Sequence, residues 1–251
     1  MMTESTKREL NRIGSLRYGW WRVSKGIVES VSEFASQEIP SWTMEQVTST
    51  FQAGGVVVIP TDTVYGLSSS LDPKGIDEIF AAKRRPRDVA LPVLLNHLEA
   101  ALDLVAPDAG RERARLQVLG RTFWPGALTV VVRRDPRLRV ELGGNDQCSI
   151  GLRVPKSVVV RSLIDHVGPI VVTSANLHRQ TPITDAAEFL EPRNENLVAR
   201  LAGILSDREG SSALPSTVVD LRERDLKFLR IGIISPTEIQ DAIDQSSYSE
   251  R

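Results

Sequence analysis

Short apolar runs that end abruptly in polar residues recur along the chain. The clearest run, Val56 to Ile59, stops at Pro60, and Thr61, Asp62 and Thr63 follow at once. A short continuous apolar run bounded by turn residues is typical of a buried strand. The same pattern predicts further strands at residues 91–95, 128–132, 149–154, 170–172, 217–221 and 227–231.

Apolar residues recur at helical spacing between these runs. Asp72 and Pro73 indicate the start of one helix, because Asp caps a first turn and Pro fits its first position. Ile76, Ile79 and Phe80 lie on the face of this helix that is predicted to pack inward. Other helices are predicted at residues 42–51, 97–105, 111–119, 158–167, 185–190 and 195–202, and from residue 236 onward.

Several polar, glycine- or serine-containing segments are predicted to be loops. They are the Ser-rich stretch at residues 66–70 and residues 135–147, 177–184 and 210–212. Arg111, Arg113 and Arg115 are expected to form a solvated helix face. Strands and helices alternate for most of the chain, but not strictly. This arrangement favours an α/β fold with a mixed sheet over a purely parallel one.

The composition limits the function classes. Of 251 residues, 41% are hydrophobic and 25% are charged, which is ordinary for a globular protein with a core. The formal net charge of −1 provides no overall basic field for nucleic acid. No apolar run approaches the roughly 20 residues that cross a bilayer, so no membrane association is expected. The single cysteine excludes an intrachain disulfide and fits a cytoplasmic location, and the three histidines share no metal-site spacing, so no metal site is predicted.

The first forty residues differ from the rest of the chain. We divide the chain into an N-terminal extension (1–40), one catalytic domain (41–246) and a disordered tail (247–251). In the extension, basic residues surround the aromatic cluster Tyr18, Trp20 and Trp21. Exposed Trp pairs are uncommon, so we favour an extension whose aromatic side chains dock on the domain. A basic arm that contacts RNA is the alternative.

Lys83 and Arg85 are the first candidates for ligand binding. They end the predicted helix that follows the Val56–Ile59 strand and its polar loop. Residues just past the carboxyl end of a strand line the crevice where open sheets bind ligands. The planar fork of Arg and the point charge of Lys suit an anion such as a triphosphate. A solvated basic helix end, which complements the helix dipole, is the alternative interpretation.

Six motifs then occur in a fixed order. PTDTVYGL at residues 60–67 is followed by K-x-R-P at 83–86, and the other five are FWPGALT (123–129), SIGLRVP (149–155), TSAN (173–176), PSTVVD (215–220) and LRIG (229–232). Together they resemble the YrdC-like family over residues 42–240. The resemblance implies a twisted mixed parallel/antiparallel sheet, flanked by helices, around a concave site.

The resemblance also implies an activity. YrdC-like enzymes make L-threonylcarbamoyladenylate and pyrophosphate from L-threonine, bicarbonate and ATP, for threonylcarbamoyladenosine modification of tRNA. The amine captures bicarbonate, and the resulting carbamate attacks the α-phosphate of ATP. Mg²⁺ is expected to arrive with the nucleotide, and downstream tRNA threonylcarbamoyl transferase proteins to receive the product. The alternatives are a carbamoyl-adenylate handling protein and a non-catalytic module that contacts tRNA or double-stranded RNA.

For ATP, the resemblance carries over five residues. Lys83 and Arg85 match the catalytic positions that hold the triphosphate. Ser149, Asn176 and Arg230 match positions that contact the nucleotide.

For L-threonine, the resemblance carries over one arginine and several hydroxyls. Arg153 matches the position that pairs with the carboxylate, although a surface strand residue is the alternative. The hydroxyl positions are Thr61 or Thr63, Ser174 and Ser216. Asp62 is expected to orient a basic neighbour. The chain departs from the family pattern at Val89, Ala90, Leu94, Ala127 and Leu177-His178, which puts contacts on the substrate side in question.

Overall fold

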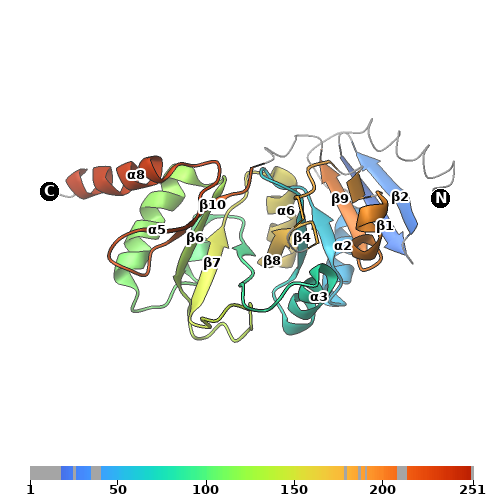
Figure 1. The fold of residues 1–251 in the computed structure, drawn as a ribbon, viewed down its shortest axis with the longest axis horizontal. Helices are drawn as coiled ribbons and strands as arrows, with labels where there is room; N and C mark the ends of the chain where they lie inside the picture. Colours follow the sequence, from blue (N-terminus) through green and yellow to red (C-terminus); the bar gives the residue numbers. More distant parts are fainter. Residues whose placement is uncertain are drawn as a thin grey trace.

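A computed structural model describes residues 18–24, 27–34, 41–177, 180–185, 188–189, 191–207 and 214–249. Within these residues, strands form one 11-stranded sheet in the order β11-β10-β6-β7-β5-β8-β4-β3-β9-β1-β2. The pairs β10/β6, β5/β7 and β3/β9 are parallel and the other neighbours antiparallel, which confirms the predicted mixed sheet. Figure 1 shows the sheet running along the long axis of the molecule, with α8 at one end and the β1–β2 hairpin at the other.

The strands are β1 (Tyr18–Ser24), β2 (Ile27–Phe34), β3 (Val57–Ile59), β4 (Gly66–Ser70), β5 (Val93–Leu94), β6 (Leu128–Arg133), β7 (Ser149–Arg153), β8 (Ile170–Ser174), β9 (Gly203–Asp207), β10 (Thr217–Asp220) and β11 (Lys227–Arg230). The helices are α2 (Ser41–Gln52), α3 (Pro73–Lys83), α4 (Leu98–Leu102), α5 (Gly110–Phe123), α6 (Val158–Val167), α7 (Glu195–Val198) and α8 (Pro236–Ser249). Among the described helices, none combines the length and apolar character needed to cross a bilayer.

Helix α3 begins and ends as its sequence predicts. Asp72 is the N-cap, and its side chain accepts a hydrogen bond from the backbone N–H of Gly75 at 3.0 Å. Pro73 follows at the first helical position, where its missing N–H has no helical partner to lose. Arg84 ends the helix in the left-handed conformation, at φ 49°. This sharp stop turns the chain toward Arg85 immediately after the last helical residue.

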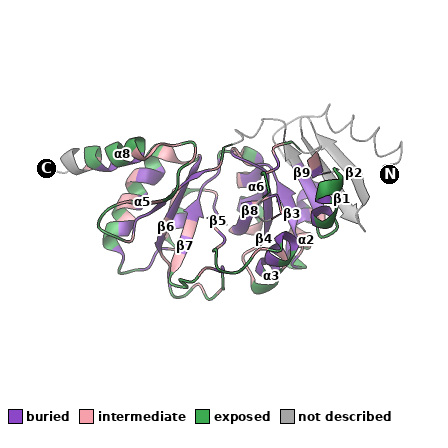
Figure 2. Cartoon of the chain, viewed as in Figure 1, coloured by how far each residue is buried: buried purple, intermediate pink, exposed green. Residues whose placement is uncertain are grey.

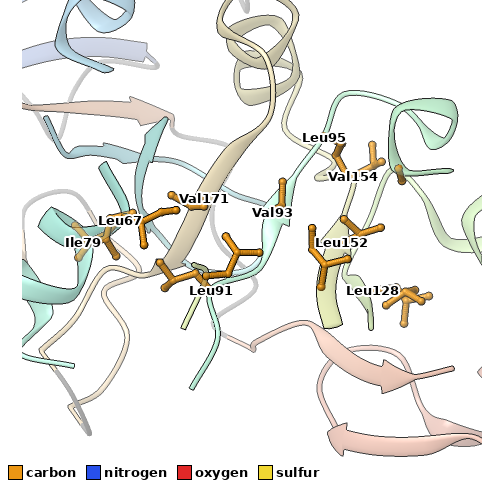
Figure 3. Close-up of a cluster of buried hydrophobic side chains, with 14 of the residues drawn as sticks. Leu67, Ile79, Leu91, Val93, Leu95, Leu128, Leu152, Val154 and Val171 are labelled. Carbon is orange, nitrogen blue, oxygen red and sulfur yellow. The ribbon is translucent and has the colours of Figure 1, made fainter. Parts of the chain in front are cut away.

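The sheet buries side chains on both faces. Alternate residues of one strand enter different cores: Val58 packs in one, whereas Val57 and Ile59 pack in the other. The larger core includes Leu67, Ile79, Leu91, Val93, Leu95, Leu128, Leu152, Val154 and Val171, which Figure 3 shows converging from strands and helix α3. Figure 2 shows central strands such as β6 and β8 mostly buried and the outer surfaces of the helices exposed.

Helices cover the two faces unequally, and this difference creates the site. On one face, residues of α3, α5 and α8 join the larger core along most of the sheet. On the other, α2 and α6 cover β3, β8 and β9 through the smaller core. That second face carries Thr129 and Val131 of β6, Gly151 of β7 and Val218 of β10, which instead line an open cavity. The concave site expected from the family resemblance therefore lies on the part of this face that helices leave uncovered.

Besides β1 and β2 in the N-terminal extension, two strands of the catalytic domain were not predicted. Residues 66–70, expected to be a loop, form the central strand β4, which pairs with β3 and β8. Its serines are buried because their hydroxyls donate to backbone carbonyls, Ser68 to Val57 at 2.8 Å and Ser69 to Gly55 at 2.7 Å. Strand β9 was missed because only Ile204 and Leu205 form its apolar run.

The expected domain boundaries need two corrections. The backbone of β1 and β2 forms a hairpin, and β1 pairs with β9, so this part of the N-terminal extension continues the domain's sheet. The side chains on which aromatic docking or RNA contact depends lie outside the described part of the chain, as do residues 1–17. Helix α8 reaches Ser249, so the disordered tail expected from residue 247 is wrong for residues 247–249. Buried Ile239 and Ile243 anchor this helix to the larger core.

Other boundaries shift modestly. Helix α4 is shorter than predicted: it begins after its N-cap His97, whose Nδ1 accepts from the N–H of Ala100 at 3.1 Å, and it ends at Leu102. Helix α7 is one turn long after a 3₁₀ turn at 192–194, and the helix expected at 185–190 lies partly outside the described residues, as do 210–212. The solvated face expected on α5 is observed at Arg111, which is exposed, whereas Arg115 is partly buried. Their guanidinium groups donate to the carbonyls of Arg222, Glu223 and Arg224, between β10 and β11.

Candidate active site

A cavity of about 590 Å³ lies over β10, β6, β7 and the adjoining ends of β8 and β4. Eight of the ten residues predicted for the site line it, and Lys83 and Asn176 do not. The lining residues predicted from the sequence are Thr61, Thr63, Arg85, Ser149, Arg153, Ser174, Ser216 and Arg230. They come from segments up to 169 positions apart (230 − 61), so the fold brings most of the predicted site together.

Arg153 is buried at one end of the cavity, with 6% of its surface exposed. Its Nε donates to the Gly126 carbonyl at 3.0 Å, Nη1 to Thr63 Oγ1 at 3.0 Å and Nη2 to Asp62 Oδ1 at 2.8 Å. A guanidinium has five N–H groups, so one on each terminal nitrogen remains for a ligand. Burial lowers the pKa of Arg153, and the charge of Asp62 opposes that shift. The alternative of a surface residue is therefore wrong.

Asp62 holds Arg153 in place, as the sequence suggested. Its Oδ1 also accepts from the backbone N–H of Lys156 at 3.0 Å, which joins the loop after β3 to the loop after β7. Beside it, Thr61 Oγ1 lies 3.0 Å from Thr63 Oγ1 and donates to the Val64 carbonyl at 2.6 Å. The hydroxyls and the arginine thus form a single preorganised end of the cavity.

We expect Asp62→Ala to lower the free energy of unfolding by about 3 kcal/mol, because it leaves the buried Arg153 charge without its partner. The matched control is Asp77→Ala, which breaks an ion pair with Arg87 whose two side chains are 65% and 49% exposed. An exposed pair contributes at most about 1 kcal/mol. Urea unfolding followed by tryptophan fluorescence measures both. Equal losses in the two variants would contradict the importance of the buried pair.

Arg85 and Arg230 face the cavity without an ion pair to a carboxylate among the described residues, although the charge of Asp88 opposes the lowering of the Arg85 pKa by burial. Arg85 donates to the carbonyls of Val89 and Ala90 and to Thr173 Oγ1, at 3.2–3.3 Å. Arg230 Nε donates to the Ser216 carbonyl at 2.9 Å. Burial lowers the pKa of Arg230, and the nearby charges of Arg153 and Arg85 lower it further. Cations without ion-paired carboxylates that are close enough to affect one another create a site for a multiply charged anion.

The hydroxyl of Ser216 is used within the protein. It accepts from Arg230 Nη2 at 2.8 Å and lies 2.9 Å from Thr129 Oγ1. Ser216 is buried, with 3% of its surface exposed, so its principal observed contact is with Arg230. Thr129, which sequence reasoning missed, is the second hydroxyl of this pair. The arrangement fixes Arg230 against the cavity wall.

Lys83 does not line the cavity but lies buried behind Ser174, which does. Only 2% of its surface is exposed, and its ammonium contacts the carbonyl and hydroxyl of Ser174 and the side-chain oxygen of Asn176. Asn176 is also buried, and its amide nitrogen donates to the carbonyls of Leu177 and Gln180. Both side chains therefore brace the loop that presents Ser174 to the cavity.

Ser149 and Arg222 lie toward the other end of the cavity. Ser149 Oγ donates to the Asp146 carbonyl at 3.2 Å. Arg222, which the sequence analysis did not select, lines the cavity and pairs with Asp220 and Asp146. Hydrogen bonds to Asp220 are the main reason that the pKa of Arg222 is raised. Arg222 lies just past the end of β10. A polar residue directly after a buried strand is the same sequence signal that identified Thr61 and Thr63 after β3, so this signal could have identified Arg222 as well.

The cavity lining contains no carboxylate, and the described residues contain no cluster of three or more His, Cys, Asp or Glu side chains that could hold a metal ion. The hydroxyl and arginine groups present are suited to anions and not to Mg²⁺, which prefers carboxylate and phosphate oxygens. The described cavity therefore does not offer a protein-bound magnesium site.

Comparisons with known proteins agree with this geometry. The family model for the Sua5/YciO/YrdC domain, described as "Telomere recombination", matches residues 49–232. This chain belongs to the Sua5/YciO/YrdC family. The match spans β3 to the end of β11 and contains every predicted site residue, so the YrdC-like resemblance seen in the sequence is confirmed.

Two relatives and one solved structure illustrate the similarity. A Mycobacterium tuberculosis protein named "Putative threonylcarbamoyl-AMP synthase" is 34% identical over 195 residues, covering 76% of this chain and 85% of the relative. The Pyrococcus abyssi threonylcarbamoyl-AMP synthase is 30% identical over 212 residues, covering 83% and 59%. The structure of P. abyssi Sua5 complexed with L-threonine is 29% identical, with a TM-score of 0.68, covering 82% of this chain and 58% of that one. This Sua5/YciO/YrdC chain thus spans under two thirds of the archaeal relative's length.

Proposed function

We propose that this Sua5/YciO/YrdC protein is an L-threonylcarbamoyladenylate synthase, a nucleotidyltransferase that uses L-threonine, bicarbonate and ATP and releases pyrophosphate. The observation that carries the proposal is the charge arrangement of the cavity. A buried arginine with two unused N–H groups lies at one end, and in the same lining Arg85 and Arg230 form no ion pair with any described carboxylate. This arrangement suits two anions held close together: an amino-acid carboxylate and a triphosphate.

The proposed mechanism relies on positioning. Arg153 orients the threonine carboxylate through two parallel hydrogen bonds, which a planar guanidinium makes well. Arg85 and Arg230 neutralise the phosphates and the charge that develops as the carbamate oxygen attacks the α-phosphate. Carbamates hydrolyse easily, so a cavity that limits water protects the intermediate. ATP enters as the magnesium complex, and the metal is part of the substrate.

We expect pyrophosphate release only when ATP, L-threonine and bicarbonate are all present. Omitting each substrate in turn, with detection of pyrophosphate and of the adenylate by mass spectrometry, tests this expectation. Pyrophosphate release that continues without threonine would contradict the proposal. Comparison with L-serine tests whether the cavity reads the threonine methyl group, since one methyl group in a pocket is worth about 10–200-fold in selectivity.

The wider role remains part of the same proposal. We expect the product to pass to downstream tRNA threonylcarbamoyl transferase proteins, and the enzyme to act in the cytoplasm. Contact with tRNA or double-stranded RNA is the alternative use of the arginine-lined cavity. RNA binding that weakens steeply with salt, without ATP consumption, would favour that alternative.

A further inference from the structure

Lys83 is a buried base next to a cavity-lining hydroxyl. Its Nζ lies 3.2 Å from Ser174 Oγ and 3.2 Å from Asn176 Oδ1, and it also contacts the Ser174 carbonyl. Among the described residues, no carboxylate lies within ion-pair distance of Lys83. Burying an ammonium without a counter-ion is costly. Burial therefore lowers the pKa of Lys83 to about 7, and the charge of Arg85 contributes to the shift. Ser174 and Asn176, which face Lys83 from β8 and the loop after it, are uncharged.

The three contacts serve both protonation states of Lys83: an ammonium donates to all three oxygens, and a neutral amine donates two hydrogen bonds and accepts one. The Ser174 carbonyl and Asn176 Oδ1 can only accept, so they take the two N–H groups. Asn176 cannot rotate to offer its nitrogen without losing hydrogen bonds, because Nδ2 already donates to the carbonyls of Leu177 and Gln180. In the ammonium form Nζ donates to Ser174 Oγ at 3.2 Å; in the neutral form its lone pair can accept the hydroxyl proton of Ser174 instead. The Ser174 oxygen can then accept a hydrogen bond from a donor group of a ligand in the cavity.

We propose that Lys83 and Ser174 form a proton relay that accepts the proton released when the threonine amine is carboxylated. This inference rests on the proposed function. Ser174 lines the same cavity as Thr61 and Thr63, and it pairs with Gly66 at the start of β4, just after the loop that carries both threonines. Ser174 contacts the substrate in this scheme, and Lys83 acts through Ser174.

The step balances as follows. Threonine enters with its amine protonated, so the nitrogen has no lone pair to react. Ser174 Oγ accepts one ammonium proton as its own hydroxyl proton moves to Lys83 Nζ. The freed amine attacks the carbon of bicarbonate, and the new C–N bond forms as the bicarbonate hydroxyl leaves with the second amine proton as water. The products are the carbamate, water and protonated Lys83, which returns its proton to solvent before the next turnover.

The test is the pH dependence of pyrophosphate release, with ATP and threonine saturating and the bicarbonate concentration held constant. Because the neutral form of Lys83 is the active one, the wild-type rate should rise about tenfold per pH unit below a pKa of about 7 and level off above it. Ser174→Ala removes the hydroxyl but keeps the carbonyl that contacts Lys83. We expect it to slow the reaction about a hundredfold and to remove the rise near pH 7.

Two further variants separate the relay from a structural role. Lys83→Arg keeps a positive charge and hydrogen-bond donors but cannot lose its proton, so its rate should stay low at every pH while ATP binding persists. Ser149→Ala is the matched control, because Ser149 lines the cavity but donates to the Asp146 carbonyl and not to a base. Whatever its rate, its profile should keep the wild-type shape.

A measurement independent of activity completes the test. In protein carrying ¹³C-labelled lysine, the NMR signal that Lys83→Arg removes should titrate near pH 7 in the wild type and in Ser174→Ala. The relay would be overturned if the Lys83 signal titrated near the ordinary lysine pKa. It would also be overturned if Ser174→Ala kept the wild-type rate and the wild-type pH profile. Wild-type protein that forms no pyrophosphate at any pH would instead overturn the proposed function, and the NMR titration would still report on Lys83.

Discussion

Arg85→Ala is expected to weaken ATP binding about ten- to a hundredfold and to leave threonine binding nearly unchanged. Arg85 lines the cavity without an ion pair to a carboxylate among the described residues, so its charge is available to the phosphates. A hydrogen bond to a charged group contributes about 1.5–3 kcal/mol, and about 1.4 kcal/mol corresponds to a tenfold change in affinity. Calorimetric titration with a non-hydrolysable ATP analogue measures the effect.

Arg87→Ala is the matched control for this prediction. Arg87 lies on the same loop, but it pairs with Asp77 and stacks over the Phe80 ring, and it does not line the cavity. We expect its ATP affinity to match that of the wild type. If both variants lose affinity equally, the loss reflects general attraction by the basic loop. If Arg85→Ala binds ATP normally, Arg85 belongs to the solvated helix end that the sequence also allowed.

Arg153→Lys is expected to weaken threonine binding about tenfold or more while ATP affinity changes little. The substitution keeps the positive charge next to Asp62, so the ion pair and long-range attraction persist. An ammonium cannot reproduce the three contacts that Arg153 makes with Gly126, Thr63 and Asp62 and also present two parallel donors to a carboxylate. Loss of orientation also slows in-line attack on the α-phosphate.

The control for this second prediction is Arg161→Lys. Arg161 donates to the carbonyls of Pro155 and Lys156, close to Arg153 in the chain, but does not line the cavity. Titrating threonine into both variants, with the ATP analogue present, separates a specific carboxylate contact from a general effect on the loop after β7. Equal threonine affinity in Arg153→Lys and the wild type would remove Arg153 from the binding site.

Local sequence patterns were sufficient for the elements whose stability is local. Asp72 and Pro73 predicted the start of α3 because capping and the fixed backbone of proline act within one turn. Helix α6 has the predicted bounds, because its amphipathic pattern is continuous and Ser157 accepts from the Val160 N–H as its cap. The motifs also selected most of the cavity lining, since all but K-x-R-P contain or border a strand.

The sequence analysis was wrong or undecided for segments whose burial depends on partners far away in the sequence. The serines of β4 resemble a loop because serine is polar, yet their hydroxyls are satisfied by the carbonyls of Gly55 and Val57 across the fold. A surface position was an equal alternative for Arg153 until Asp62, 91 residues away in sequence, was seen to accept its hydrogen bond. Burial and pairing are properties of two segments together, so one segment's composition cannot reveal them.

The sequence by itself determined the family, the mixed α/β character and the set of residues that carry charge and hydroxyl groups to the site. The tertiary structure alone decided what each of those residues does. It placed Arg85, Arg153 and Arg230 around one cavity, and it turned Lys83 inward, where burial lowers its pKa to about 7. The reason is physical: a residue's type sets which bonds and charges it can offer, whereas its solvation and partners depend on which face of the sheet the helices leave uncovered.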